Sequence, residues 1–406
     1  MIVRARMVVT MDGPPIENGA VAISGSKIIE TGRFSEVSLQ HPGEDILDLG
    51  EQALLPGLIN AHCHLDYTCL RGKIPPPKSF ADWIQAINVE KTKLSSNDYI
   101  RSIHDGFAEA QEFGTTAIAN LTAFPELIAK INGPIRTWWF AELIDVRNPQ
   151  RVREIVDHAT ESLKSTEHWG LAPHTPFTAS ANLYRECEEF AQREKILLTT
   201  HLAESPEEMS MFRDANGPLY DFLKSIGRDM SDCGQSTPLH RFSEIVKDPS
   251  TSVGMTDDWI IAHLNELAEK DFDLLERLAT KFSIVHCPRS HDYFAHSRFQ
   301  FEKLGTLGFN ICLGTDSLAS NDDLSLFAEM RAFREKFPDV PAEEVLSMVT
   351  TNAASALGQE SAIGKIAAGF VADLIALPCS DSGKVFEEII AFDQPVNWSM
   401  VRGVIQ

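Results

Sequence analysis

Eight short apolar segments alternate with longer amphipathic stretches through the middle of the chain, and this alternation most limits the folds available to it. The candidate strands are Leu54–Ala61, Thr115–Asn120, Ile135–Leu143, Trp169–Pro173, Ile196–Leu202, Trp259–His263, Phe282–Cys287 and Asn310–Gly314. Repeated strand–helix units predict a parallel sheet, and eight of them within about 260 residues predict a (β/α)8 barrel. An open doubly wound sheet would carry a glycine-rich phosphate turn after its first strand. The sequence has no such turn.

Both ends of the chain differ from this middle part. Short apolar runs separated by turn residues predict strands within residues 1–54 and again within 359–406. Neither end is long enough to bury a sheet alone, so we expect the two to form one small β-sandwich domain. The barrel would then span 55–358, which makes the fold class α/β. Residues 205–256 separate the fifth and sixth strands by about twice the usual distance, and we expect an insertion over the barrel mouth.

Charge and cysteine content exclude several kinds of partner. The chain has 36 basic and 58 acidic residues, a formal net charge of −22. Nucleic acid and anionic membranes need concentrated Lys and Arg, so neither is expected. No apolar run approaches the ~20 residues that a membrane helix needs. Seven cysteines without short paired spacing indicate a reduced, cytoplasmic compartment. A small molecule is therefore the expected partner.

Histidines gather where the candidate strands end. In a barrel, chemistry sits at the carboxyl ends of the strands, because only the loops there share one cavity. In chain order these ends carry His62, His64, His174, His201, His263, His286 and Asp316. Side chains two positions apart on a strand point to the same face, so His62 and His64 can chelate one metal ion. Alone, the pair could also be two histidines in a polar turn.

Later strand ends supply further candidates. His201 is a suitable zinc or iron ligand. Glu204, three residues on, would lie beside the reactive water and carry its proton, or else merely lie near the start of a helix. Asp316 could complete the metal site or cap a helix, and we favour the ligand role.

Three histidines, one aspartate and a water molecule already satisfy a single metal ion. His263 is therefore assigned a catalytic role, in which it would stabilise developing negative charge. His286 is assigned no role, because a hydrogen-bonded core histidine explains it equally well.

Five segments together resemble the amidohydrolase superfamily, over essentially the whole chain. They are Leu55–Leu65, Ala172–Thr178, His201–Ser205, Gly314–Leu324 and Gly364–Leu374. The resemblance is to its deaminase branch, which includes adenosylhomocysteine, aminodeoxyfutalosine and cytosine-type aminohydrolases. It implies a metal-dependent hydrolytic deaminase that releases ammonia, and we also expect a homodimer.

The resemblance also implies a ligand set. His62, His64, His201 and Asp316 would hold one divalent metal, zinc first, with iron or manganese as alternatives. Two-metal members carry a carboxylated lysine on the fourth strand, where this chain has His174, so one metal is expected and His174 would touch substrate. Glu204 would protonate a ring nitrogen and then the departing amine.

The substrate is expected to be an aminopurine nucleoside or a similar compound. Asp66, Arg71, His174, Arg289 and His291 all follow strand ends and should surround the cavity outside the metal ligands. A flat ring alone would not need them, so they imply a ribose or a charged arm. Arg289 would bind an anionic arm unless it pairs with a structural carboxylate.

Three alternatives use the same metal site: hydrolysis of a cyclic amide, hydrolysis of an aryl chloride, and deamination of a free base. A non-catalytic scaffold is disfavoured because every expected ligand is present.

Overall fold

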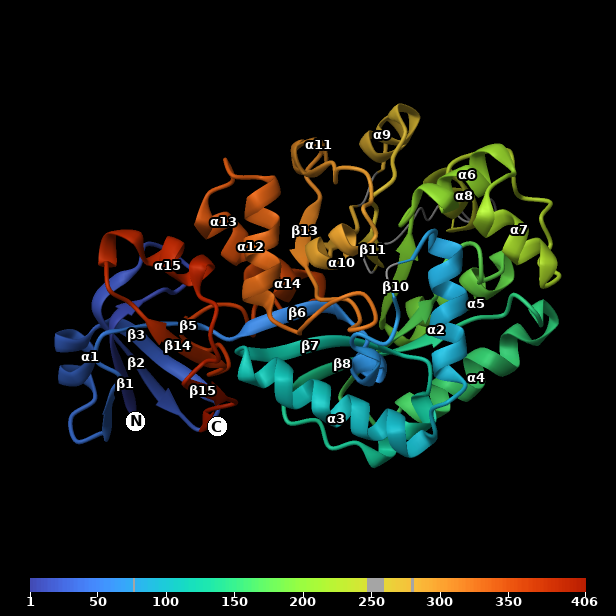
Figure 1. The fold of residues 1–406 in the computed structure, drawn as a ribbon. Helices are drawn as coiled ribbons and strands as arrows, with labels where there is room; N and C mark the ends of the chain where they lie inside the picture. Colours follow the sequence, from blue (N-terminus) through green and yellow to red (C-terminus); the bar gives the residue numbers. More distant parts are fainter. Residues whose placement is uncertain (76, 247–258, 279–280) are drawn as a thin grey trace.

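Two eight-stranded sheets organise the molecule, which is described by a computed structural model covering residues 1–75, 77–246, 259–278 and 281–406. One sheet is entirely parallel, and its strands are adjacent in chain order from β6 to β13 (Figure 1). These strands are β6 (Leu58–Cys63), β7 (Thr115–Thr122), β8 (Arg136–Leu143), β9 (His168–Pro173), β10 (Leu197–Leu202), β11 (Trp259–His263), β12 (Ser283–His286) and β13 (Asn310–Leu313). The predicted (β/α)8 architecture is confirmed.

The first and last parallel strands meet at the end of β13. Cys63 forms a parallel bridge with Asp316, and the Thr315 N–H donates to the His62 carbonyl at 3.1 Å. Gly314 makes this approach possible, since a Cβ there would lie 2.7 Å from the His62 carbonyl oxygen. The contact places the residue after β13 beside the end of β6. The side chains at the end of β6 and just after β13 can therefore reach the same site.

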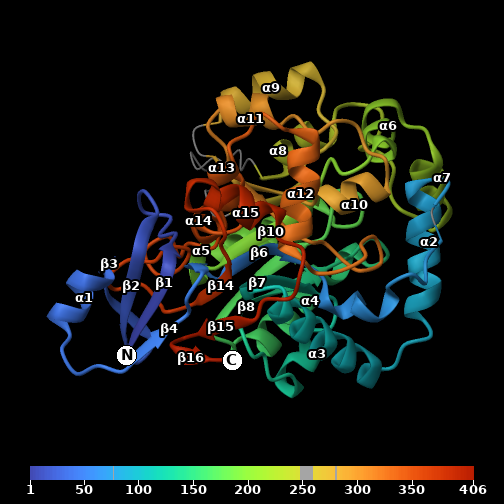
Figure 2. The same ribbon diagram turned by 60° about the vertical axis from the view of Figure 1, so that its left-hand side comes forward.

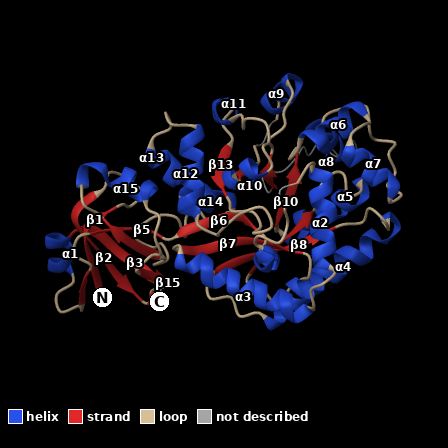
Figure 3. Cartoon of the chain, viewed as in Figure 1, coloured by secondary structure: helices blue, strands red, loops and turns tan. Residues whose placement is uncertain are grey.

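Most of the helices cover the outside of the barrel, while the first packs on the sheet formed by the ends of the chain (Figure 3). The helices are α1 (Phe34–Gln40), α2 (Phe80–Lys91), α3 (Ser96–Glu112), α4 (Val152–Leu163), α5 (Ala181–Glu194), α6 (Pro206–Asp214), α7 (Pro218–Ser225), α8 (Pro238–Val246), α9 (Glu269–Glu276), α10 (Pro288–Tyr293), α11 (Phe301–Thr306), α12 (Leu326–Lys336), α13 (Ala342–Ser347), α14 (Thr351–Ala356) and α15 (Val385–Ala391). A reciprocal Ser95–Asp98 capping box starts α3. Its buried residues recur every three or four positions, which gives one face to the strands.

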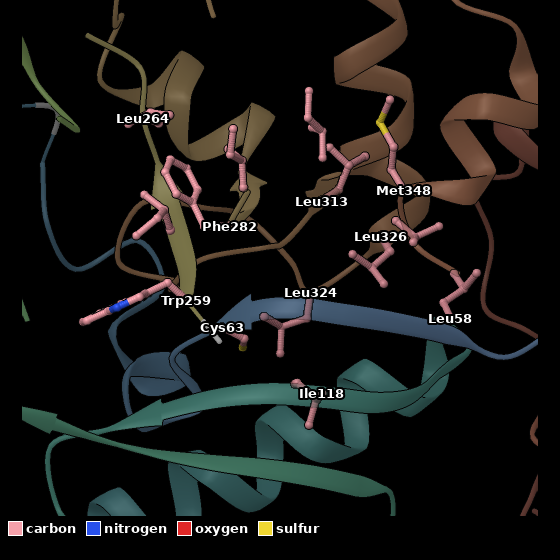
Figure 4. Packing of buried hydrophobic residues seen from close by; sticks show 14 of the residues in the cluster. Leu58, Cys63, Ile118, Trp259, Leu264, Phe282, Leu313, Leu324, Leu326 and Met348 are labelled. Carbon is pink, nitrogen blue, oxygen red and sulfur yellow. The ribbon is translucent and has the colours of Figure 1, made fainter. Parts of the chain in front are cut away.

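Strand residues alternate between two apolar clusters. Ile118 of β7 packs with Leu58, Trp259 and Leu313 in the cluster between strands and helices (Figure 4). Ala117 and its second neighbour Ala119 belong to a separate cluster with Phe140 and Val285. Because side chains of a strand point alternately to opposite faces, this second cluster fills the barrel interior.

Both ends of the chain contribute to the second sheet. Its order is β16-β15-β14-β5-β1-β2-β3, with β4 paired to β1, and β14 is antiparallel to β5. Figure 2 shows that the N-terminus and the C-terminus both lie at this sheet. The strands are β1 (Ile2–Val8), β2 (Ile16–Ser24), β3 (Lys27–Arg33), β4 (Ile46–Asp48), β5 (Gln52–Pro56), β14 (Leu374–Pro378), β15 (Trp398–Val401) and β16 (Val404–Ile405). This sheet agrees with the small β domain that the sequence predicts from both ends of the chain.

The candidate strand Leu54–Ala61 is in fact two strands in two sheets. Its first part is β5 of the terminal sheet, and its second part is β6 of the barrel. The break falls at Gly57, where a Cβ would lie 2.2 Å from the Thr116 side chain. The sequence could not reveal this division, because the residues of both strands are buried and form one continuous apolar run.

Three helices, α6, α7 and α8, occupy the described part of the expected insertion, and residues 247–258 lie outside the described residues. Arg228 fastens this segment to the loop after β9 by donating to the carbonyls of Phe177, at 2.8 Å, and Pro176, at 3.1 Å. Across the four described ranges, no helix has the length and apolar character needed to span a membrane.

Candidate active site

A cavity of about 850 Å³ opens at the carboxyl ends of the barrel strands. Its lining includes seven polar side chains that follow or end strands: His64, Glu142, His174, His201, Glu204, His263 and Asp316. Trp83 and Ile87 of α2 and Leu223 of α7 form part of an apolar wall. Residues far apart in sequence therefore share one partly apolar chamber.

The four predicted ligand side chains lie together. The Nε2 atoms of His64 and His201 are 3.2 Å apart, and Asp316 Oδ1 lies 3.8 Å from Nε2 of both His62 and His64. One ligand atom from each of the three histidines falls within 4.8 Å of the others. Neither ring nitrogen of His62 has a hydrogen-bond partner among the described residues, although the side chain is fully buried.

Neighbouring groups hold these side chains in place. His201 Nδ1 donates to the His174 carbonyl at 3.1 Å, which leaves Nε2 facing the cluster. Asp316 Oδ2 accepts from Ser290 Oγ at 2.6 Å, which leaves Oδ1 free to face the histidines. Such outer hydrogen bonds fix the ring orientation and protonation of a metal ligand.

Burial sets the protonation of the cluster. Burial, followed by the nearby imidazoles, lowers the pKa of His62 and of His64 well below the ordinary histidine value. Burial lowers the pKa of His201 to about 4. The rings are therefore neutral near pH 7, and a neutral imidazole is the form that binds metal.

The backbone is strained where the strands enter the site. Ala203, His263, Leu264 and Asp316 all have φ between +50° and +74°, a region that non-glycine residues rarely adopt. Each lies at or just after the end of β10, β11 or β13. Strain of this kind persists where the surrounding structure fixes a functional geometry.

Glu204 and His263 form a second group beside the cluster. Glu204 Oε1 lies 3.8 Å from His263 Nε2, and that nitrogen has no hydrogen-bond partner among the described residues. Burial, and then Asp316 and Glu208, raise the pKa of Glu204 well above the ordinary value. Glu208 supports the loop by accepting from the N–H groups of Ala203 and Glu204. Glu204 is therefore a buried carboxyl group that takes up a proton more readily than an exposed glutamate does.

Of the five residues expected to contact substrate, the structure brings only His174 to the cavity lining. Its Nδ1 lies 2.7 Å from Thr178 Oγ1, and its Nε2 lies 3.8 Å from Glu142 Oε1. Asp66 is fully buried behind the lining, where Oδ2 accepts from Thr122 Oγ1 and from the Ala123 N–H.

The expectation that both arginines bind substrate is not met. Arg71 pairs with Glu109, while Arg289 pairs with Asp323 at 2.6 Å and Asp322 at 3.3 Å. His291 packs beside His286 instead of lining the cavity. For Arg289, this is the alternative that the sequence left open, in which the guanidinium pairs with structural carboxylates. Its guanidinium therefore gives no argument for an anionic substrate arm.

Two cavity features were missed in the sequence. Glu142 is the next-to-last residue of β8, and an examination of acidic residues at every strand end would have found it. Lys91 ends α2 with its Nζ 4.7 Å above the Tyr67 ring, and it has no carboxylate within 4.0 Å among the described residues. No local pattern marks Lys91, because only the packing of α2 over the barrel brings it to the cavity.

Comparison with known proteins agrees with this geometry. Residues 53–405 match the model of the amidohydrolase family. The chain is 30% identical over 393 residues to a 5-methylthioadenosine/S-adenosylhomocysteine deaminase of Syntrophobacter fumaroxidans, covering 91% of this chain and 83% of that protein. It is 27% identical over 392 residues to the Pyrococcus furiosus protein of that name, covering 92% and 85%.

Two solved structures share the fold. The aminofutalosine deaminase of Helicobacter pylori in complex with methylthio-coformycin superposes with a TM-score of 0.86 at 19% identity, covering 100% of this chain and 99% of that one. An adenosine deaminase from Xanthomonas campestris with bound zinc has a TM-score of 0.77 at 22% identity, covering 100% and 92%.

Proposed function

The chain belongs to the amidohydrolase family, and from this membership and the site geometry we propose that it is a metal-dependent deaminase of an aminopurine nucleoside or a closely similar compound. The reaction would replace a ring amino group by oxygen and release ammonia. The observation that carries the proposal is the position of the Glu204 side chain. This side chain is a buried carboxyl group with a raised pKa, and it lines the cavity together with His64, His201 and Asp316 of the predicted ligand set.

The four clustered side chains fit one divalent metal ion, zinc most readily, with iron or manganese as alternatives. Three neutral imidazoles and one carboxylate are a donor set that suits zinc. His62 supports the assignment, because its buried ring nitrogens have no protein partner among the described residues. A metal ion bound there would lower the pKa of a water molecule toward neutrality and so supply the nucleophile.

Glu204 is the proton carrier in this proposal. Its carboxylate takes one proton from the attacking water and passes it to the ring nitrogen beside the amino-bearing carbon. It passes the second proton of that water to the departing amine, which leaves as ammonia. His263 Nε2, 3.8 Å from Glu204, and Asp316 Oδ1 orient the water.

A nucleoside fits the cavity better than a free base does. About 850 Å³ is far more than one ring system fills, and drug-sized ligands occupy pockets of about 300–1,000 Å³. His174 lines the cavity with Nδ1 on Thr178 Oγ1, so its Nε2 is available to donate to a ring nitrogen. The relatives named above also act, by their names, on adenosine derivatives.

Ammonia release from a panel of amines tests the proposal. The metal-loaded protein should deaminate adenosine, 5-methylthioadenosine, S-adenosylhomocysteine or aminofutalosine with a higher kcat/KM than adenine or cytosine. Better turnover of a free base would remove the nucleoside preference while leaving the deaminase intact. Hydrolysis of only a cyclic amide or an aryl chloride would contradict deamination itself.

Cellular location and assembly are also part of the proposal. All seven cysteines are free thiols, as expected in a reducing cytoplasm. The expected homodimer stays a prediction, and light scattering of the purified protein would test it.

A further inference from the structure

The carboxylate of Glu142 has no hydrogen-bond donor among the described residues, unlike most buried acids near the barrel mouth. Asp145, three residues further, accepts from the Ser180 N–H at 2.7 Å and from Ser180 Oγ at 2.6 Å. Glu208 and Glu329 each accept two donors as well. Among the described residues, none donates a hydrogen bond to Glu142, although its side chain is only 6% exposed. Buried carboxylates normally have such donors.

The position of Glu142 points into the cavity. It lines that cavity at the end of β8, with Oε1 4.0 Å from His64 Nδ1 and 3.8 Å from His174 Nε2. These separations are too long for hydrogen bonds. Glu204 is the other buried acid of the lining whose side chain accepts no hydrogen bond from a described residue, and the proposed reaction already uses it. An acid left without donors in a ligand cavity indicates that the ligand brings them.

The chemistry of the substrate ring decides which donors these are. The ring of an aminopurine nucleoside presents nitrogen lone pairs at its edge, apart from the amino group that is removed. A carboxylate facing such an edge would be repelled, whereas His174 Nε2–H would fit it. The remaining donors of a nucleoside are its sugar hydroxyls, of which only the 2′- and 3′-hydroxyls are adjacent to each other. The two oxygens of one carboxylate can accept from both of these hydroxyls, and an acidic residue already accepts from the ribose 2′-hydroxyl in dinucleotide-binding folds.

We propose that Glu142 is a specificity-determining residue that accepts hydrogen bonds from the 2′- and 3′-hydroxyls of the substrate ribose. This inference rests on the proposed nucleoside deaminase function. It also assigns the selection of nucleosides over free bases to this acid, and not to Arg289.

Sugar-modified substrates and Glu142 variants test the proposal together. The kcat/KM values of adenosine, 2′-deoxyadenosine, 3′-deoxyadenosine and 2′,3′-dideoxyadenosine are measured for the wild type, Glu142→Gln and Glu142→Ala. The wild type should lose about 100-fold between adenosine and the dideoxy analogue, because each hydrogen bond to a charged group is worth roughly tenfold or more. In Glu142→Ala this ratio should fall below about fivefold, with metal content unchanged. Glu161→Ala, which removes an exposed acid outside the cavity lining, should keep the wild-type ratio.

Two outcomes would overturn the role of Glu142. A Glu142→Ala enzyme that still distinguishes the sugars by about 100-fold would show that other groups read the hydroxyls. Loss of bound metal in both variants would make Glu142 a positioning residue for His64 or a metal ligand, since Glu142, His174 and His201 could also hold an ion. Failure of the proposed function looks different, because the wild type would then release no ammonia from any nucleoside.

Discussion

His62 and Asp316 should be needed to retain metal. Replacing either by alanine removes one of the four clustered donors, and the loss of a mere outer partner already costs 10–100-fold in metal affinity. We expect His62→Ala or Asp316→Ala to lower metal affinity by more than about 100-fold and to abolish turnover, as measured by elemental analysis and chelator competition. His291→Asn, a half-buried histidine outside the cavity, is the control and should keep its metal. Full metal content in His62→Ala would refute the assignment.

Glu204 should be needed for the rate and not for binding. Glu204→Gln keeps the size of the side chain but cannot carry a proton, and a positioned general acid–base group contributes about 10²–10⁴-fold. We therefore expect kcat to fall by at least about 100-fold, while KM and metal content stay near the wild-type values. Steady-state kinetics on the metal-loaded variant measures this. Normal turnover would remove Glu204 from the mechanism.

Residues that belong to strand ends could be predicted, while residues of loops could not. His62, His201 and Asp316 each end or follow an apolar strand, so the barrel geometry alone brings them to one place. Arg71 and Arg289 also follow strands, but the loops after β6 and β12 fold on and bring them to carboxylates instead of the cavity. Which acid an arginine meets depends on packing between distant segments, and no local pattern encodes it.

At the scale of elements, α2 is held over the cavity by an acid from α6. Glu207 accepts from the N–H groups of Phe80 and Ala81, at 2.6 and 3.1 Å, at the start of α2. These N–H groups have no partner within the helix, and a negative charge there is favourable. The residue lies three positions after Glu204, so one segment carries the proposed proton carrier and also fixes a cavity wall.

Removing this cap should weaken substrate binding. Capping side chains are worth about 1 kcal/mol, so Glu207→Ala should raise KM for a nucleoside about fivefold through a looser α2. We expect kcat at saturation and metal content to change little. Glu244→Ala in α8, an exposed acid, is the matched control. An unchanged KM in Glu207→Ala would mean that packing alone holds α2.

The number of strands could be predicted, but not their division between sheets. All eight barrel strands lie within or overlap the predicted segments, because short apolar runs between amphipathic stretches are typical of buried parallel strands. The break at Gly57 was missed, since β5 and β6 are both buried and give one continuous apolar run. The placement of α2 beside α7 could not be predicted either, because it depends on which helix faces meet in space.

At the scale of the whole molecule, a group of histidines outside the metal cluster should make stability depend on pH. The rings of His286 and His291 are 5.0 Å apart, and those of His291 and His296 are 5.6 Å apart. Neither ring nitrogen of His296 has a partner among the described residues. Burial, and then His291, lower the pKa of His296 to about 3, and burial also lowers the pKa of the other two.

The sign of this dependence follows from proton binding. The unfolded chain binds protons at these histidines below about pH 6.5, whereas the folded chain resists them until pH 3 in the case of His296. Stability is therefore full above pH 6.5 and falls as the pH drops from 6.5 toward 3, by at most about 1.4 kcal/mol per pH unit for each histidine.

His296→Phe, beside Phe80 and Phe294, removes one such group and keeps a ring there. Urea unfolding of metal-free wild type and His296→Phe between pH 4.5 and 7 should show a slope flatter by about one proton in the variant, with the two curves becoming parallel near pH 7. Identical slopes would mean that His296 takes up its proton as readily in the folded chain as in the unfolded one.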